Sequence, residues 1–394
     1  MFSRLTDKYR LLQHLAAFTI AWVSAWLLFI YVLRPITVPQ PSPGYHADTL
    51  GKGEAAVHNL LYLSSALRNG KVVVVLGSSE LEQALWNPYT PNIFFPRHRL
   101  ARVLTYGKAG FETLGMYGLL NGVRPHLNPH SRLVIMLSPA WFRVTDLQTD
   151  IFAKNFNDNV LLQDYWSDEV RSVFHDYLTA HQFEFANMTA AQKLYLDDPS
   201  SIVDGQLPEF LGRTTNVRAY AQRVKLDIYL ASLTQHKATE SYDAGNSEDL
   251  PWDHYREEAR AYEAAQMAHN DLWVRDGFYD HYRKAGRLSH RRYFSDTMNP
   301  EPEMAALREL LQMLQLSKVK AMFVMQPLNP KLYDDMDRFL PVDARVAALC
   351  REYGMHYYDM YKMPYQKGIL RDSSHPGQFG WEEIDHEIAE YFRL

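Results

Sequence analysis

Residues 71–81 read Lys71-Val72-Val73-Val74-Val75-Leu76-Gly77-Ser78-Ser79-Glu80-Leu81. A run of β-prone apolar residues that ends at a glycine is typical of a strand buried on both faces of a parallel sheet. The serines stand where a helix begins, which places a hydroxyl at the carboxyl edge of the sheet, where α/β proteins hold their sites. Serine is also a common helix N-cap, so the motif alone allows a structural role or a catalytic one.

The same kind of strand recurs along the chain. Apolar β-prone runs occupy residues 103–106, 133–137, 319–325 and 355–358, and helix-like periodicity fills 80–86, 302–314, 343–353 and 382–392. This alternation predicts an α/β fold in which helices cover both faces of a central parallel sheet, as a three-layer α/β/α domain over residues 51–394. Residues 150–290 have helix-like spacing without a strong strand run, and we expect a helical insertion there.

The N-terminal segment differs in character from the rest. Residues 11–33 contain no Asp, Glu, Lys or Arg, and a helix of that length reaches across the roughly 30 Å hydrocarbon layer of a bilayer. Basic side chains dominate residues 1–10, so the positive-inside rule predicts a cytoplasmic N-terminus, one transmembrane helix and an extracytoplasmic domain on the cell membrane. The proline-rich residues 34–50 are expected to form a stalk. A cleaved signal peptide and a buried helix are the alternatives.

Composition excludes several classes of function. The 394 residues contain 41 Lys and Arg against 46 Asp and Glu, a formal net charge of -5. The chain therefore lacks the overall basic surface that nucleic-acid binding requires. The single cysteine, Cys350, rules out an intramolecular disulfide and a cysteine-clustered zinc site. We expect neither a metal nor a cofactor.

A second polar cluster, Asp372-Ser373-Ser374-His375, lies near the C-terminus. A serine hydroxyl becomes a nucleophile when an imidazole accepts its proton, and the imidazole needs a carboxylate that fixes its tautomer. An aspartate three residues before a histidine can aim both groups from one loop. We therefore predict that His375 contacts a serine after the first strand. Chemistry alone does not choose between Ser78 and Ser79.

These motifs resemble blocks of the SGNH (GDSL-like) hydrolase superfamily. Gly77-Ser78-Ser79-Glu80 is similar to the first block and Asp372-Ser373-Ser374-His375 to the last. The resemblance implies a triad of Ser79, His375 and Asp372. Tyr106-Gly107-Lys108-Ala109-Gly110-Phe111 is similar to the second block, which implies that the N–H groups of Ser79 and Gly110 form an oxyanion hole.

The third block departs from the superfamily. Its asparagine completes the oxyanion hole, but Ser138-Pro139-Ala140-Trp141 occupies this region here, and Ala140 has no side-chain donor. Removal of one such donor costs about 10²–10³-fold in rate. Either another group such as Gln326 supplies the hydrogen bond, or hydrolysis is not the main reaction.

The whole chain resembles the DltD family of D-alanyl-lipoteichoic acid biosynthesis proteins. The resemblance rests on the N-terminal anchor and on Gly77-Ser78-Ser79-Glu80-Leu81, Ser138-Pro139-Ala140-Trp141-Phe142, Gln326-Pro327-Leu328-Asn329, Asp372-Ser373-Ser374-His375-Pro376 and Gly380-Trp381, in this order. It implies a membrane-anchored, extracytoplasmic serine acyltransferase or esterase that transfers D-alanine onto (lipo)teichoic acid through a D-alanyl-serine. It also implies that Trp141, Gln326 and Asn329 contact the substrate.

The resemblance further implies partners at the membrane. A membrane-bound O-acyltransferase of the DltB kind and a D-alanyl carrier protein of the DltC kind would deliver the donor, directly or indirectly, and the lipoteichoic acid polymer would accept it. Two other classes of function remain open. One is an SGNH-type thioesterase or esterase that hydrolyses acyl groups, and the other is a non-catalytic scaffold that presents donor and polymer.

Overall fold

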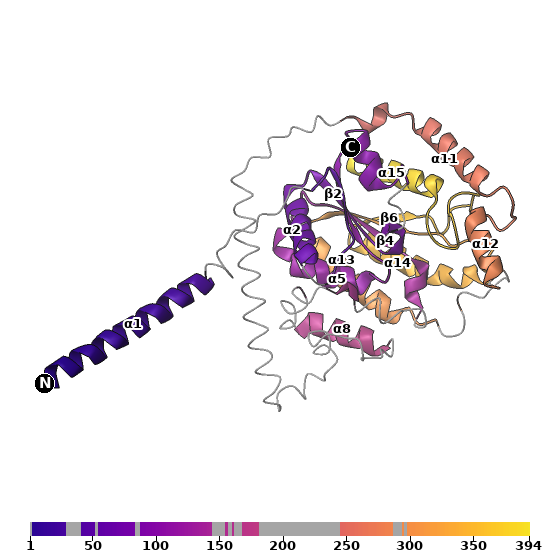
Figure 1. Ribbon diagram of the computed structural model, residues 1–394. Coiled ribbons are helices and arrows are strands. Elements are labelled where there is room, and N and C mark those ends of the chain that lie inside the picture. The colour runs from indigo at the N-terminus through magenta and orange to yellow at the C-terminus, as the bar shows by residue number, and fades with distance from the viewer. Residues whose placement is uncertain are drawn as a thin grey trace. The chain divides into compact units, whose positions relative to one another are not determined.

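The computed structural model describes residues 2–28, 41–51, 54–82, 87–143, 154–156, 160, 168–180, 245–286, 294 and 298–394. The chain divides into two units, one of Met1–Pro39 with Gly205–Thr239 and one of Gln40–Asp204 with Glu240–Leu394. In the first unit the structure describes helix α1 (Phe2–Leu28). The second unit holds a six-stranded sheet and the helices around it (Figure 1).

The sheet is parallel, with the strand order β1-β3-β2-β4-β5-β6. Its strands are β1 (Gly44–Ala47), β2 (Val72–Gly77), β3 (Arg102–Gly107), β4 (Arg132–Leu137), β5 (Lys320–Met325) and β6 (His356–Asp359). The strand that follows β2 in the chain, β3, lies toward one edge of the sheet, and the strand that follows β4, β5, lies toward the other edge. A crevice for ligands is expected at such a switch point, outside the carboxyl ends of β2 and β4. The predicted parallel α/β sheet is confirmed.

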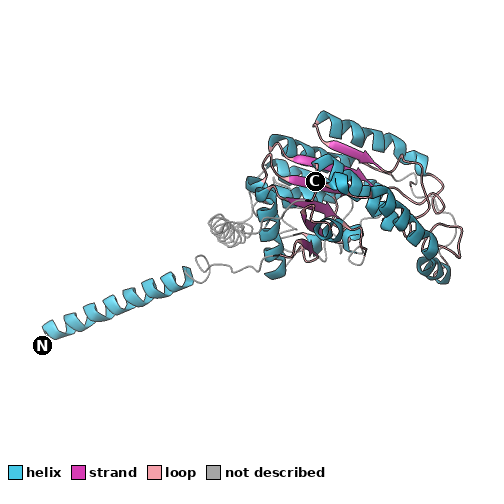
Figure 2. Ribbon diagram, turned by 90° about the horizontal axis from the view of Figure 1, so that it is seen from above, coloured by secondary structure: helices cyan, strands magenta, loops and turns pink. Residues whose placement is uncertain are grey.

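Helices cover both faces of the sheet (Figures 1 and 2). On one face lie α2 (Glu54–Asn69), α5 (Thr113–Gly122), α13 (Glu301–Leu316) and α14 (Leu340–Glu352), and on the other α4 (Pro91–Arg97), α11 (Trp252–Gln266) and α15 (Gln378–Phe392). The helices predicted over 302–314, 343–353 and 382–392 are confirmed. The helix predicted over 80–86 begins as α3 (Ser79–Glu82), and residues 83–86 lie outside the described residues.

Strand side chains alternate between the two faces, as the period of two requires. Val73 and Val75 of β2 pack in one buried cluster with Phe379, Trp381 and Ile384 of α15. Burial of a side chain of this size contributes about 1.5–3 kcal/mol relative to its exposure. Helix α15 is therefore fixed on the sheet, and so is the loop that enters it.

The structure corrects the boundary of the predicted stalk. Residues Gly44–Ala47 form β1 and pair in parallel with Val103–Tyr106 of β3. The sheet domain therefore begins before residue 51, because part of the segment assigned to the stalk adds an edge strand. Residues 34–40 of the predicted stalk lie outside the described residues.

Helix α1 contains most of the segment predicted to span a membrane, and residues 29–33 of that segment lie outside the described residues. Among the helices that the structure describes, none combines the length and the apolar character needed to cross a bilayer. The predicted transmembrane helix is therefore not confirmed.

The part of the predicted insertion that the structure describes contains helices joined by turns. Within residues 150–290 lie α8 (Asp168–Ala180), α11 and α12 (Asp276–Lys284). Helix α8 is linked to α5 by Tyr177, whose hydroxyl donates to Glu112 at 2.8 Å. Residues 181–244 of the insertion lie outside the described residues.

Helix α15 carries two fully buried carboxyl groups, those of Glu382 and Asp385. Burial raises the pKa of Glu382 to about 7, although the guanidinium of Arg256, 3.4 Å away, lowers it. Burial, and then the neighbouring Glu382, raise the pKa of Asp385 well above its usual range. Between about pH 4 and pH 7 the folded chain therefore binds protons that the unfolded chain releases. The free energy of unfolding must fall as the pH rises through this window.

We expect Glu382→Gln to remove part of this pH dependence, because the amide does not ionise. Thermal unfolding should show the free energy of unfolding of the variant rising by roughly 1–3 kcal/mol relative to wild type at pH 8, with little change at pH 5. The exposed Glu257 is the matched control, and Glu257→Gln should leave the pH dependence unchanged. Equal pH dependence in Glu382→Gln and wild type would mean that the buried carboxyl is ionised in the folded protein.

Candidate active site

The turn between β2 and α3 places Ser79 at the carboxyl edge of the sheet. Gly77 ends β2, and α3 begins two residues later. A Cβ on Gly77 would lie 2.3 Å from Glu80 Oε1, and a Cβ on Gly107 would lie 2.1 Å from the Gly77 carbonyl oxygen. A side chain at position 107 would therefore collide with the backbone of β2, and one at position 77 would collide with the side chains of Glu80 and Leu81 in the turn that follows.

Ser79 faces the loop that follows β6. Its Oγ lies 2.9 Å from His375 Nε2, and His375 Nδ1 lies 2.8 Å from Asp372 Oδ2. The three side chains form one hydrogen-bonded line, although Ser79 and His375 are 296 positions apart in the chain. The predicted contact between the hydroxyl at position 79 and the ring at position 375 is confirmed.

Asp372 forms the buried end of this line. Its side chain is 3% exposed, and Oδ1 accepts the backbone N–H groups of Ser374 and His375, both at 2.9 Å. Burial raises the pKa of Asp372, but the hydrogen bonds from the His375 ring and from these two N–H groups outweigh burial, so the pKa lies below its usual value. An ionised carboxylate at this place fixes the imidazole tautomer that presents a lone pair to a hydroxyl, and it stabilises an imidazolium.

The two neighbouring serines have different surroundings. Ser78 is 4% exposed, and its Oγ accepts the Gly110 N–H at 3.1 Å and donates to the Lys108 carbonyl at 3.3 Å. Ser78 therefore points at the loop after β3, whereas the hydroxyl of Ser79 contacts His375. The N–H of Gly110, which the motif comparison places in an oxyanion hole, has Ser78 Oγ as its acceptor.

Asn329 is a structural contact between two loops. Its side chain is fully buried, and Nδ2 donates to the Leu272 carbonyl at 2.9 Å and approaches the Asp372 carbonyl at 3.5 Å. Its backbone N–H donates to the Ser373 carbonyl at 3.1 Å. These bonds tie the loop after β5 to the loop that carries Asp372, so the Asn329 amide is occupied by backbone rather than presented to an open site.

Trp141 also lies mostly inside the protein. It belongs to the 3-10 turn η3 (Pro139–Phe142) that follows β4, and it is 7% exposed. Ala140 in the same turn is partly buried. In the structure the Trp141 side chain is therefore packed inside the protein near the carboxyl end of β4.

Glu80 and Gln326 are buried polar residues at this edge of the sheet, with exposed fractions of 4% and 3%. Glu80 Oε1 accepts the Ser78 N–H at 2.6 Å. Burial raises the pKa of Glu80, while the Ser78 N–H, His375 and the Gln326 side chain lower it. An acidic residue in the first turn of a helix is common, so the sequence pattern did not single out Glu80.

Two residues of the insertion, Glu263 and Arg275, form hydrogen bonds with the loop that carries Asp372 and His375. Glu263 of α11 is fully buried and accepts the Gln378 N–H at 2.6 Å and Arg275 Nε at 3.0 Å. The backbone N–H of Arg275 donates to the Arg371 carbonyl at 2.8 Å. The insertion is therefore hydrogen-bonded to both ends of the segment that contains Asp372 and His375. Sequence reasoning missed these residues because charged side chains in a helical stretch read as a solvated surface.

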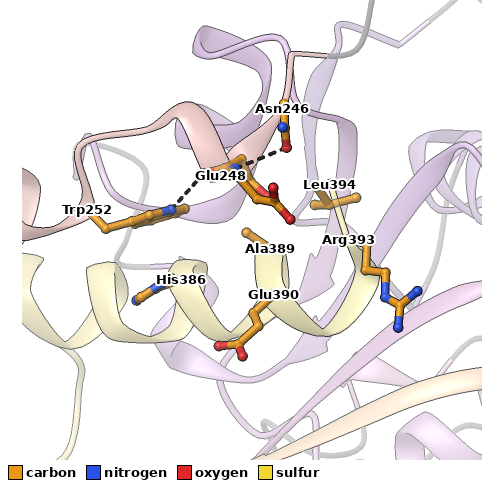
Figure 3. A pocket seen from close by; sticks show the side chains of 9 residues that line it. Asn246, Glu248, Trp252, His386, Ala389, Glu390, Arg393 and Leu394 are labelled. Atoms are coloured by element: carbon orange, nitrogen blue, oxygen red, sulfur yellow. Dashed lines mark hydrogen bonds between the residues drawn. The ribbon is translucent and has the colours of Figure 1, made fainter.

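A pocket of about 330 Å³ lies away from this site. It is lined by Trp252 and His386, whose rings stack, and by residues at the C-terminal end of α15, including Glu390 and Leu394 (Figure 3). Helix α15 has 15 residues and is therefore roughly 22 Å long. Because His375 precedes the opposite end of that helix, the pocket does not belong to the Ser79 site.

Fold and site together define a class of protein: a parallel α/β protein that holds a serine, a histidine and an aspartate in one hydrogen-bonded line at the carboxyl edge of its sheet. The model of the family described as "DltD protein" matches residues 54–393. The chain therefore belongs to the DltD family.

Two relatives agree with this assignment. "Protein DltD" of Staphylococcus aureus (strain NCTC 8325 / PS 47) is 22% identical over 342 residues, which cover 82% of each chain. "Protein DltD" of Bacillus subtilis (strain 168) is 22% identical over 390 residues, which cover 93% of this chain and 96% of that protein. The resemblance to the DltD family, inferred from the motifs, is confirmed.

Proposed function

We propose that this protein transfers D-alanine onto teichoic acid through an ester on Ser79. The observation that carries the proposal is the hydrogen-bonded line from Ser79 through His375 to Asp372. Membership of the DltD family, which the motifs associate with D-alanyl-lipoteichoic acid biosynthesis, supplies the substrate class.

The first half of the reaction loads the serine. His375 Nε2 accepts the proton of Ser79 as Oγ attacks the carbonyl carbon of an activated D-alanyl donor. Asp372 stabilises the imidazolium that forms. The carbon–oxygen or carbon–sulfur bond to the donor then breaks, and His375 returns the proton to the departing alcohol or thiol. The D-alanyl group is left as an ester of Ser79.

The second half moves the acyl group to the polymer. A hydroxyl of the teichoic acid chain attacks the ester carbonyl while His375 accepts its proton. The bond to Ser79 Oγ breaks, and His375 returns the proton to the serine. The products are a D-alanyl ester of the polymer and the free enzyme, so donor and acceptor exchange one acyl group and one proton.

Water competes with the polymer for the same ester. The His375 side chain is 20% exposed, so the site is open enough for an acceptor to reach the ring, and water can use the same approach. Efficient transfer requires that the bound polymer displace water from Ser79. Hydrolysis by the same triad is therefore the second candidate function.

We also propose that α1 attaches the protein to the cell membrane, with the sheet domain on the extracytoplasmic side. Phe18, Ile20 and Trp22 are 69%, 68% and 60% exposed along this helix, and a row of exposed large apolar side chains marks a membrane or protein contact. A membrane-bound O-acyltransferase and a D-alanyl carrier protein would then supply the donor there. Fractionation of cells that express the full chain checks this, and a protein found entirely in the soluble fraction would exclude the anchor.

The proposed activity is tested with the full-length protein, an activated D-alanyl thioester and lipoteichoic acid. Intact-mass spectrometry should detect one D-alanyl group on the protein, and the adduct should disappear when the polymer is added, with D-alanyl ester appearing on the polymer. Release of free D-alanine faster than polymer loading would favour the hydrolase. No adduct, together with unchanged polymer loading in cells that carry Ser79→Ala, would favour the scaffold.

A further inference from the structure

Attack on a carbonyl group creates a negative oxygen that needs hydrogen-bond donors in fixed positions. Two donors expected near Ser79 are unavailable in the structure. The N–H of Gly110 is bound to Ser78 Oγ at 3.1 Å, and the side chain of Ala140 carries no donor. Besides the backbone N–H of Ser79, the site must draw a hydrogen-bond donor from elsewhere if acyl transfer occurs at this residue.

Gln326 carries a buried donor that the folded protein does not use. Its side chain is 3% exposed, and Nε2 has no hydrogen-bond partner among the described residues. An unsatisfied buried polar group costs about 1–3 kcal/mol, so an unpaired amide that persists in the fold calls for an explanation, of which a catalytic role is one. Gln326 is the first residue after β5, and its backbone N–H donates to the Leu137 carbonyl at 2.9 Å. The backbone from which the amide extends is therefore fixed at the carboxyl edge of the sheet.

Gln326 and the nucleophile Ser79 both follow the carboxyl ends of parallel strands, β5 and β2. The amide makes no hydrogen bond to Glu80, the residue that follows Ser79, but it lies near enough to that carboxyl group to lower its pKa, as His375 also does. Glu80 is held in turn by the N–H of Ser78 at 2.6 Å. Glu80 thus connects the turn that carries Ser79, the ring of His375 and the amide of Gln326.

We propose that Gln326 Nε2 donates a hydrogen bond to the oxyanion that forms when an acyl carbonyl is attacked by Ser79, and that Glu80 positions this amide. This inference rests on the proposed function, because it assigns a donor to the acyl-transfer site. Gln326 thus acts as a catalytic residue that binds the carbonyl oxygen of the D-alanyl substrate. The loop after β5 supplies the hydrogen-bond donor that the turn after β4 lacks.

A pair of donors that differ in one atom tests the proposal. A D-alanyl ester and the matching thionoester both acylate a serine, but the sulfur of the thionoester is a poor hydrogen-bond acceptor. In Gln326→Met the acylation of Ser79 by the ester should slow by about 10²–10³-fold, and acylation by the thionoester should slow far less. The ratio of the two rates, measured by intact-mass spectrometry of the full-length protein, should therefore fall by more than tenfold.

The controls separate this inference from a structural role and from the proposed function. Gln315 is exposed on α13, and Gln315→Met should leave both rates unchanged. Gln326→Leu, with its melting temperature measured, repeats the test if Gln326→Met unfolds. Equal slowing with both donors, or none, overturns the oxyanion assignment while the adduct on Ser79 still stands. Absence of any adduct in the wild type overturns both proposals.

Discussion

Ser79→Ala is expected to eliminate the D-alanyl adduct and to lower the rate of acyl transfer by roughly 10⁴–10⁶-fold, the range seen when a triad serine is removed. The reason is that the hydroxyl 2.9 Å from His375 Nε2 is the group that forms the ester. Binding of donor and polymer does not replace a missing nucleophile. Intact-mass spectrometry of the purified variant measures the adduct, and the D-alanine ester content of complemented cells measures transfer.

Ser78→Ala is the matched control for this result. The Ser78 hydroxyl bridges the Gly110 N–H and the Lys108 carbonyl, and each lost hydrogen bond costs about 0.5–1.5 kcal/mol. We expect the adduct to form in this variant, at a rate within about tenfold of wild type. An adduct that persists in Ser79→Ala and is lost in Ser78→Ala would assign the nucleophile to the first serine instead.

The fold was largely predictable because its central strands are almost wholly apolar. The runs that contain Val72–Gly77 and Arg132–Leu137 are buried on both faces, and only such strands lack a polar alternation. Strand β1 (Gly44–Ala47) was missed because it is four residues long at the sheet edge and follows a run of prolines. Its strand conformation comes from pairing with β3, which no local pattern reveals.

The candidate site was predictable only in part, because several of its contacts depend on tertiary packing. Ser79, His375 and Asp372 lie in short motifs whose chemistry requires one another, so their meeting could be expected. The contacts that hold them come from residues without a motif. Asn329 looks like a substrate contact in the sequence, but its amide binds backbone carbonyls, and Glu263 is buried against the Gln378 N–H from a helix of the insertion. Tertiary packing alone decides such roles.

Asp372→Asn should slow formation of the Ser79 adduct by about 10⁴-fold, the cost of the same change in a serine protease triad. The asparagine can still accept the N–H groups of Ser374 and His375 that Asp372 Oδ1 accepts at 2.9 Å, so the loop should keep its shape. What it loses is the negative charge 2.8 Å from His375 Nδ1, which fixes the tautomer and stabilises the imidazolium. The rate of adduct formation measures the loss, and the melting temperature at pH 7 shows whether the fold is intact.

The pH dependence of stability gives this variant a second signature. Because the pKa of Asp372 is lowered in the folded protein, the ionised group stabilises the fold above its ordinary pKa of about 3.9, and that stabilisation is lost as the pH falls through the lower folded-state value. Asp372→Asn should therefore flatten the loss of stability below about pH 4. Asp359, at the end of β6, pairs with Lys362 at 3.2 Å outside the triad, so Asp359→Asn should acylate within about threefold of wild type. An Asp372→Asn protein that acylates as fast as this control would show that His375 acts without the carboxylate.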